Sequence, residues 1–195
     1  MGMPFVAPPA AAAWQHRDAR SGFEVAFFQP LDDGYRIEGS TTAVEDGAAW
    51  IVEYEIVLDA AWTTRSARIS GRSASGSRSA VLDADGEGSW RVNGAPAPHL
   101  DGCLDVDLES SAVTNALPVH RMRLGVGRRA GAPAAYVRAL QLTVERLEQT
   151  YARLPDDGPR QRYDYAAPAF EFACQLAYDT SGLLLDYPGI AVRAG

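Results

Sequence analysis

The sequence predicts a mainly β protein, built as one domain around a large antiparallel sheet, roll or barrel with at most short helices. Three observations support this prediction. Apolar residues alternate with a period of two, most clearly from Trp50 to Leu58. Turn signals recur about every eight to twelve residues. The 195 residues can bury roughly 70% of the unfolded surface in one core, but they are too few for a second full domain.

The first part of the chain is expected to be a lead-in followed by a series of strands. Residues 1–13 are rich in Ala and Pro and are expected to be flexible, so the single domain is placed at residues 14–195. Strands are predicted at Phe23 to Phe28, Tyr35 to Ala43, Trp50 to Leu58, Thr64 to Ile69, Arg78 to Ala84, Ser89 to Val92 and Leu100 to Leu108. Between them, Asp85-Gly86 and Asn93-Gly94 supply the positive φ angles of tight hairpin turns.

The last part of the chain contains one ambiguous segment and one clear hairpin. Residues 137–154 carry apolar side chains three and four positions apart, the spacing of an amphipathic helix, whereas β-branched Thr143 and Val144 favour a strand. The residues alone leave both readings open. Aromatic and apolar residues then alternate from Phe170 to Tyr178, and a turn at Asp179 to Gly182 leads into a second strand. This pattern predicts a C-terminal hairpin.

Composition excludes several classes of function. The net charge of -7 and the absence of Lys disfavour nucleic-acid binding and exclude Schiff-base lysine chemistry. No apolar run approaches the roughly 18 residues of a membrane span, and two cysteines are too few for a disulfide framework. We therefore expect a cytoplasmic protein with reduced cysteines and no transmembrane segment.

The most informative stretch for function is Leu100 to Leu108. Strand alternation places Asp101, Asp105 and Asp107 on one face, with Cys103, and apolar residues on the other. Such an acidic face suits a metal site or a polar wall paired with Arg, unless it is simply solvated. Alternation also turns Arg65 toward the less polar side of its strand, where it needs an acidic partner. We expect Arg65 to bind a ligand anion or to close a salt bridge.

Other candidate ligand contacts are polar and aromatic. Asn115 and Arg121 flank an apolar turn that suits a pocket mouth, although a capped turn with solvated arginines explains it equally well. Tyr163 and Tyr165 share one strand face, and Trp62 and Tyr187 are further aromatic residues suited to sugars or acyl chains, unless they belong to the core. Two enzyme motifs are set aside. The loop at Gly125 to Gly131 resembles a dinucleotide-binding loop, but its last glycine comes one position late. The sequence also lacks the Gly-x-Ser-x-Gly motif of a hydrolase nucleophile.

Several motifs together resemble a known family, the bacterial proteins described as "putative glycolipid-binding". The motifs are Trp62-Thr63-Thr64-Arg65, Gly88-Ser89-Trp90-Arg91-Val92, Leu100-Asp101-Gly102-Cys103-Leu104-Asp105-Val106-Asp107-Leu108, Thr114-Asn115-Ala116-Leu117-Pro118, Gln149-Thr150-Tyr151 and Asp186-Tyr187-Pro188-Gly189. His120 departs from the family, which usually has a basic residue there. The resemblance implies an antiparallel β-roll, similar to the half-barrels that carry lipids and lipoproteins between bacterial membranes. It also implies that Gln141 to Leu154 is extended.

Together these observations lead us to expect non-catalytic binding of a lipid or glycolipid in the concave face of the roll. The expected ligand contacts are Trp62, Arg65, Asp101, Asp105, Asp107, Asn115, Arg121, Tyr163, Tyr165 and Tyr187. We expect no cofactor and no metal, and we assign no catalytic residue. The partner is a glycolipid or another amphipathic small molecule, and a homodimer stays open. The alternatives are an enzyme of glycolipid or small-metabolite metabolism with an Asp/Arg cluster, and a structural interaction module.

Overall fold

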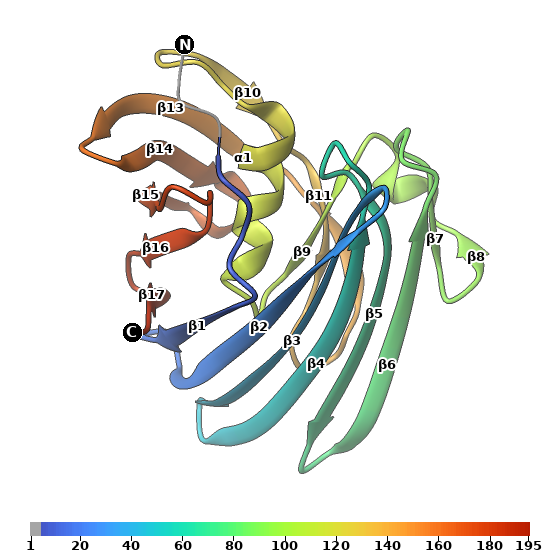
Figure 1. Cartoon of the computed structure of the whole chain (residues 1–195). Coiled ribbons are helices and arrows are strands. Elements are labelled where there is room, and N and C mark those ends of the chain that lie inside the picture. Colours follow the sequence, from blue (N-terminus) through green and yellow to red (C-terminus); the bar gives the residue numbers. More distant parts are fainter. Residues whose placement is uncertain (1–4) are drawn as a thin grey trace.

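The computed structural model describes residues 5–195, and most of them belong to one 14-stranded antiparallel sheet (Figure 1). In spatial order its strands are β10 (Arg129–Gly131), β13 (Thr150–Asp157), β14 (Arg160–Ala167), β15 (Phe172–Tyr178), β16 (Leu184–Tyr187), β17 (Ala191–Arg193), β1 (Ala11–His16), β2 (Ser21–Leu31), β3 (Gly34–Glu45), β4 (Ala48–Leu58), β5 (Thr64–Ser73), β6 (Gly76–Ala84), β7 (Trp90–Val92) and β8 (Ala95–Pro96). Within the described residues β10 and β8 are the two outer strands and do not pair, so the sheet is not closed into a barrel. The predicted mainly β fold is confirmed.

A small inner layer fills the curve of this sheet. It consists of the sheet β12 (Val144–Leu147), β11 (Ala134–Val137) and β9 (Asp105–Leu108), together with the short helix α1 (Ala116–Met122). Three 3-10 turns, η1 (Pro98–Leu100), η2 (Val113–Asn115) and η3 (Pro168–Phe170), complete the elements. In Figure 1, α1 lies between β13–β17 on one side and β2–β6 on the other. None of the helices in residues 5–195 is long and apolar enough to span a bilayer.

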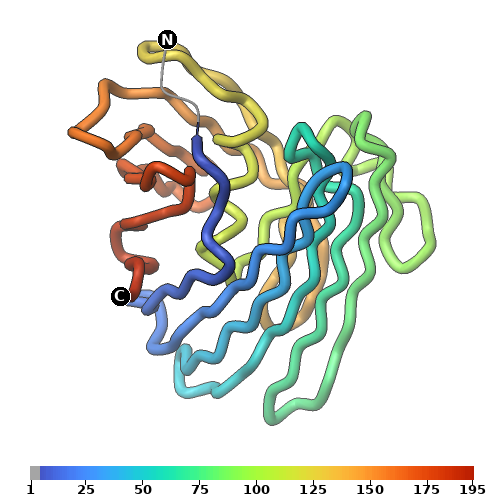
Figure 2. Tube along the Cα trace, viewed as in Figure 1, coloured from blue at the N-terminus to red at the C-terminus, as the bar shows by residue number. Residues whose placement is uncertain are grey.

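The first and last strands of the described chain pair with each other in the middle of the large sheet. Strand β1 lies beside β17 (Figure 2), and the register places Trp14 opposite Arg193. The indole of Trp14 is fully buried, and its Nε1 donates a hydrogen bond of 2.8 Å to the carbonyl of Leu184. The predicted flexible lead-in at residues 1–13 is wrong for Ala11–Ala13, because they pair with β2. Residues 1–4 lie outside the described residues.

The core follows the alternation read from the sequence. Every second residue of β4 from Trp50 to Leu58 is buried, and the predicted C-terminal hairpin is present as β15 and β16. Residues 137–154 contain no helix: after a turn at residues 139–141 they form β12 and the first part of β13, so Gln141 to Leu154 is mainly extended, as the family resemblance implies. Their helix-like spacing arises because a turn near Leu142 and the short break after Leu147 each reset the strand alternation, so that the buried side of β13 carries Tyr151 and Arg153.

Candidate functional site

The acidic stretch is not a solvated strand face. Its strand begins only at Asp105, and all four residues of β9 are buried, because the strand lies between β5 and α1. The amide of Val106 donates to Thr64 Oγ1 at 3.0 Å. Asp101 precedes the strand and is exposed, with its carbonyl oxygen accepting a hydrogen bond from Arg146. The predicted single acidic face is therefore wrong.

Both carboxylate oxygens of Asp105 accept a hydrogen bond from Arg121. The guanidinium Nε donates to Oδ1 at 2.9 Å and Nη2 donates to Oδ2 at 2.6 Å. The carboxylate is 2% exposed, so this bidentate pair fixes α1 against β9. Arg121, rather than Arg65, is the cation of the acidic stretch.

Arg65 lies on the outer side of the sheet and is exposed. The register between β4 and β5 pairs Val57 with Ser66 but Leu58 with Thr64, so Arg65 is the extra residue of a β-bulge. The bulge reverses the alternation, which turns Thr64 inward and Arg65 outward. Its guanidinium lies beside Gly86, in the turn between β6 and β7. The prediction that Arg65 points inward is wrong.

A pocket of about 230 Å³ lies between the inner layer and β14–β16, and it contains four of the predicted residues: Asp107, Asn115, Tyr165 and Tyr187. We call it the aromatic pocket, because five rings line it. They belong to Tyr136, Tyr165, Phe170, Phe172 and Tyr187.

The rings of the aromatic pocket pack on one another and on a cation. Tyr187 lies edge-on to both Tyr165 and Phe172, each at 5.9 Å between ring centroids. On the opposite wall Arg138 lies 5.2 Å from the ring centroids of both Tyr136 and Phe170. The pocket therefore offers flat apolar faces and positive charge within one small space.

Asp107 supplies the buried acidic group of the aromatic pocket. Its Oδ1 accepts a hydrogen bond of 2.8 Å from Thr114, and its Oδ2 accepts one of 2.7 Å from Gln149. Burial raises its pKa to about 6. Asp107 is 8% exposed and has no cation hydrogen-bonded to it in the described residues, so a ligand hydroxyl is a suitable further partner for its oxygens.

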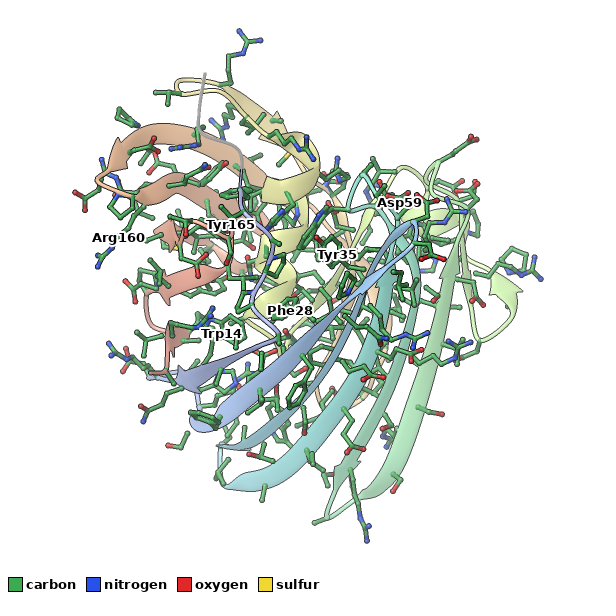
Figure 3. The ribbon with its side chains drawn as sticks, in the orientation of Figure 1. Trp14, Phe28, Tyr35, Asp59, Arg160 and Tyr165 are labelled. Atoms are coloured by element: carbon green, nitrogen blue, oxygen red, sulfur yellow. The ribbon has the colours of Figure 1, made fainter. Side chains whose placement is uncertain are left out.

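A second, larger cavity of about 680 Å³ lies at the C-terminal end of α1. We call it the helix-end cavity. Residues that line it include Phe5, Pro8, Tyr35, Trp62, His120, Leu124 and Tyr163. Trp62 and Tyr163 are thus the two predicted residues that it contains. Tyr35 and Tyr165, labelled in Figure 3, mark the helix-end cavity and the aromatic pocket respectively.

Trp62 and His120 form the floor of the helix-end cavity. Their rings stack at 3.5 Å with an interplanar angle of 8°. Burial lowers the pKa of His120 to about 4, so the imidazole is neutral at pH 7. Trp62 has φ 66°, a left-handed conformation that costs a bulky residue about 1–2 kcal/mol. Asp59 holds this turn, because its Oδ1 accepts hydrogen bonds from the amides of Ala61 and Thr63.

The ten predicted residues thus separate into four groups. Four line the aromatic pocket, two line the helix-end cavity, Asp105 and Arg121 pair with each other, and Arg65 and Asp101 lie outside both pockets. Sequence reasoning missed Arg20, Tyr136, Arg138, Phe170 and Phe172. The alternation of Phe170 and Phe172 was a usable signal, whereas Tyr136 lies in a plain apolar run.

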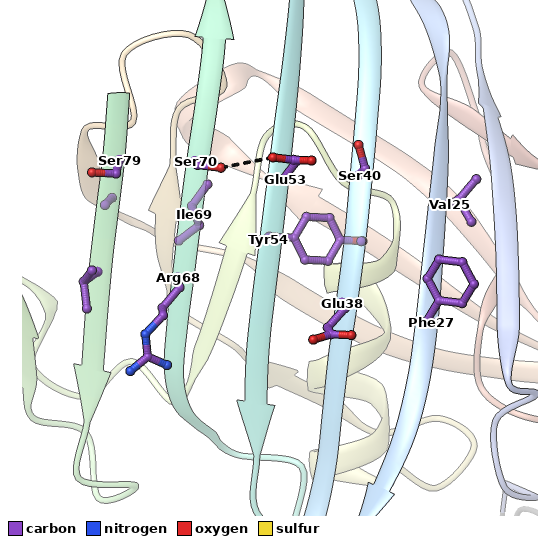
Figure 4. Close-up of a pocket in the computed structure, with 13 residues that line it drawn as sticks. Val25, Phe27, Glu38, Ser40, Glu53, Tyr54, Arg68, Ile69, Ser70 and Ser79 are labelled. Carbon is purple, nitrogen blue, oxygen red and sulfur yellow. Dashed lines mark hydrogen bonds between the residues drawn. The ribbon is translucent and has the colours of Figure 1, made fainter. Parts of the chain in front are cut away.

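The outer surface of the sheet carries a further open groove (Figure 4). It runs over β2–β6 beside Phe27 and includes Glu53, whose carboxylate accepts a hydrogen bond of 3.5 Å from Ser70. None of the ten predicted residues lines it. Among residues 5–195, no group of three or more His, Cys, Asp and Glu side chains is placed to hold a metal ion.

Comparison with known proteins gives a family and a fold. The family described as "Putative glycolipid-binding" matches residues 11–193. The crystal structure of a DUF1089 family protein from Pseudomonas aeruginosa is similar over 100% of this chain and 97% of that chain, with 30% sequence identity and a TM-score of 0.77. A beta-barrel-like DUF1849 protein from Brucella abortus is similar in fold, with 11% identity, a TM-score of 0.50 and coverage of 94% and 92%. No curated protein matches.

Proposed function

The chain belongs to the family described as "Putative glycolipid-binding", and from this premise we propose that it binds the sugar head group of a glycolipid in the aromatic pocket without transforming it. The observation that carries the proposal is the combination of ring faces and a buried carboxylate in one pocket. Sugar rings present apolar C–H faces and hydroxyl edges, so they need both kinds of partner.

The size of the aromatic pocket also favours a head group. Its volume of about 230 Å³ falls below the roughly 300–1,000 Å³ of pockets for drug-sized ligands, so it suits one small polar ring rather than a chain. Its charged side chains include Arg20 and Arg138 as well as Asp107 and Glu109. Arg20 Nη1 already donates to the carbonyl of Glu109, which positions it at the wall. These groups give directional recognition that an acyl chain does not require.

The proposal predicts a ligand that remains bound during mild purification. Protein purified from its own host without detergent is analysed by native mass spectrometry, followed by organic extraction and lipid analysis. We expect a stoichiometric glycolipid. A clean apo mass that is unchanged after incubation with host lipid extract contradicts the proposal.

The position of the head group is tested with methyl glycosides of glucose, galactose, mannose and N-acetylglucosamine in calorimetric titrations. Phe172→Ala should weaken binding of the preferred sugar about two- to tenfold, since an aromatic contact contributes about 0.5–1.5 kcal/mol. The matched control is Phe27→Ala, which removes the same ring from the exposed outer face of β2 and should leave binding unchanged. If Phe172→Ala and Phe27→Ala bind the preferred sugar with equal affinity, the sugar does not bind in the aromatic pocket.

A second candidate function is cleavage of a glycosidic bond. Asp107 and Glu109 both line the aromatic pocket, and Asp107 has a pKa of about 6 because of its burial, as a general acid requires. Glu109 accepts hydrogen bonds from Arg138 and from the amide of Ala139, which hold its carboxylate at the pocket wall. Release of nitrophenol from nitrophenyl glycosides, abolished in a folded Asp107→Asn variant, would favour the enzyme over the binding protein.

A further inference from the structure

The helix-end cavity is a separate site with a different chemistry from the aromatic pocket. The two share no lining residue, and the helix-end cavity is about three times as large, at about 680 against about 230 Å³. It extends along the N-terminal segment at Phe5–Pro8, whereas the aromatic pocket lies beyond the buried Tyr151 and Tyr178. What binds in one is therefore not fixed by what binds in the other.

The walls of the helix-end cavity are almost free of charge. Among the described residues that line it, Arg123 is the one charged side chain, and no carboxylate is present. His120 also lines it, but burial lowers its pKa to about 4 and leaves the ring uncharged at pH 7. Phe5, Trp62 and Leu124 supply large apolar surfaces. This lining excludes water-soluble cations and favours an apolar ligand with at most one anionic end.

The cavity floor is held open by a strained turn. Trp62 adopts a positive φ, and two backbone amides bound to Asp59 Oδ1 keep it there. In this conformation its indole lies flat on His120 instead of filling the space in front of it. Backbone strain of this kind persists where surrounding structure enforces it and is concentrated at ligand sites. The strained conformation of Trp62 therefore supports a ligand site here by an argument that does not depend on the cavity volume.

We propose that the helix-end cavity binds the aliphatic chain of an anionic amphiphile of the fatty-acid class, with its charged end at Arg123. Arg123 is exposed at the cavity border, and its Nε donates to the carbonyl of His120 at 3.3 Å. Its other guanidinium hydrogens have no partner within residues 5–195, so they can bind a carboxylate. The cavity volume lies within the usual range for small-molecule sites. This inference does not rest on sugar binding in the aromatic pocket.

A chain-length series tests the apolar part of the proposal. Octanoate, decanoate and dodecanoate are titrated calorimetrically below their micelle concentrations, with no sugar present. Each added buried methylene should tighten binding about fourfold, hence about 15-fold for each step of two carbons until the cavity is full. Affinity that does not rise with chain length, or the absence of binding by all three acids, overturns the proposal.

Two variants locate the chain and its charged end. Ala60→Trp adds a large ring at an exposed lining position and should weaken decanoate at least tenfold, whereas Ala74→Trp, in the exposed turn between β5 and β6, should not. Arg123→Gln should weaken decanoate about five- to tenfold and leave decanol unchanged. Because Arg123 is exposed, this variant keeps the test decisive if Ala60→Trp does not fold. Unchanged decanoate affinity in the folded Ala60→Trp or in Arg123→Gln overturns the assignment.

The same titrations separate this site from the aromatic pocket. Phe172→Ala, which weakens sugar binding under the proposed function, should bind decanoate like the wild type. Weaker decanoate binding in Phe172→Ala would contradict two independent sites. Failure of every methyl glycoside to bind, with the decanoate series intact, would contradict the proposed function and leave the helix-end site supported.

Discussion

Asp105 and Arg121 are joined by two parallel hydrogen bonds of 2.9 and 2.6 Å, and this pair connects the inner strand β9 to helix α1. Because Asp105 is 2% exposed, its charge has left water and depends on Arg121 for compensation. Each member of the pair is a near sequence neighbour of one pocket residue, since Asp107 of the aromatic pocket follows Asp105 on β9 and His120 of the helix-end cavity precedes Arg121 on α1. We therefore expect the pair to hold the two elements that carry these pocket residues in a fixed relative position.

Loss of one member of this pair should destabilise the fold more than loss of both. Arg121→Met leaves a buried carboxylate unpaired and should lower the free energy of unfolding by about 3–5 kcal/mol. The double variant Asp105→Leu/Arg121→Met removes both charges and should recover most of that loss. Urea unfolding of the four proteins of the cycle measures this. A loss below about 1 kcal/mol in Arg121→Met would show that the pair is not needed for stability.

Asp107 should make the protein more stable as the pH falls from about 6 to 4. Burial raises its pKa from the ordinary 3.8 to about 6, so the folded state binds the proton more tightly than the unfolded state. The shift corresponds to about 3 kcal/mol of folding stability. This stability is fully present below the unfolded pKa and is lost as the pH rises through the folded pKa. The unfolding free energy of Asp107→Asn minus that of wild type should therefore increase from pH 4 to pH 7. A pH-independent difference would contradict the raised pKa.

His120 should have the opposite dependence. Burial lowers its pKa from 6.5 to about 4, so the unfolded state binds more protons than the folded state between these values. Stability is then lost as the pH falls from about 6.5 toward 4, by up to about 3 kcal/mol. His120→Phe keeps a ring against Trp62 and should be less sensitive to acid than the wild type. If denaturant titrations give wild type and His120→Phe the same loss of stability in acid, then protonation of His120 does not destabilise the folded state.

How much could be predicted from the sequence differs between the sheet and the site. The long strands follow from local alternation, because strands such as β2 and β4 have one face on the core. The orientation of Arg65 could not be read, because a bulge of one residue reverses every position on one side of it. The aromatic pocket joins Arg20, Tyr136 and Tyr187, from three distant segments. Their juxtaposition depends on the curvature of the sheet, which leaves no local pattern.

The outward position of Arg65 leads to a test of the bulge. Arg65→Ala should change the free energy of unfolding by less than about 0.5 kcal/mol, because the side chain is exposed and no salt bridge with it is found in residues 5–195. Thr64→Val should be destabilising, because it removes the hydroxyl that accepts a hydrogen bond from the amide of Val106. Thermal unfolding of both variants measures this. A large loss of unfolding free energy in Arg65→Ala would contradict the outward position of the Arg65 side chain.

Gly39 should not tolerate even a methyl group. The ring of Tyr54 crosses Gly39 on the inner face of the sheet, and a Cβ there would overlap with its Cζ and hydroxyl. The hydroxyl donates a hydrogen bond of 2.6 Å to Glu24 Oε1, which also accepts one of 2.5 Å from Ser111. Displacement of the ring therefore leaves a fully buried carboxyl group with one donor fewer.

Gly39→Ala combines overpacking with that lost donor, so it should lower the free energy of unfolding by about 2–4 kcal/mol. The matched control is Gly71→Ala on β5, where the new Cβ meets only the Leu142 side chain at 3.5 Å. It should be neutral or slightly stabilising, because Ala restricts the unfolded chain more than Gly does. Urea unfolding compares the two variants. If the two variants are equally stable, the Tyr54 ring does not need the space beside Gly39. Its hydrogen bond to Glu24 can then form with the ring in another position.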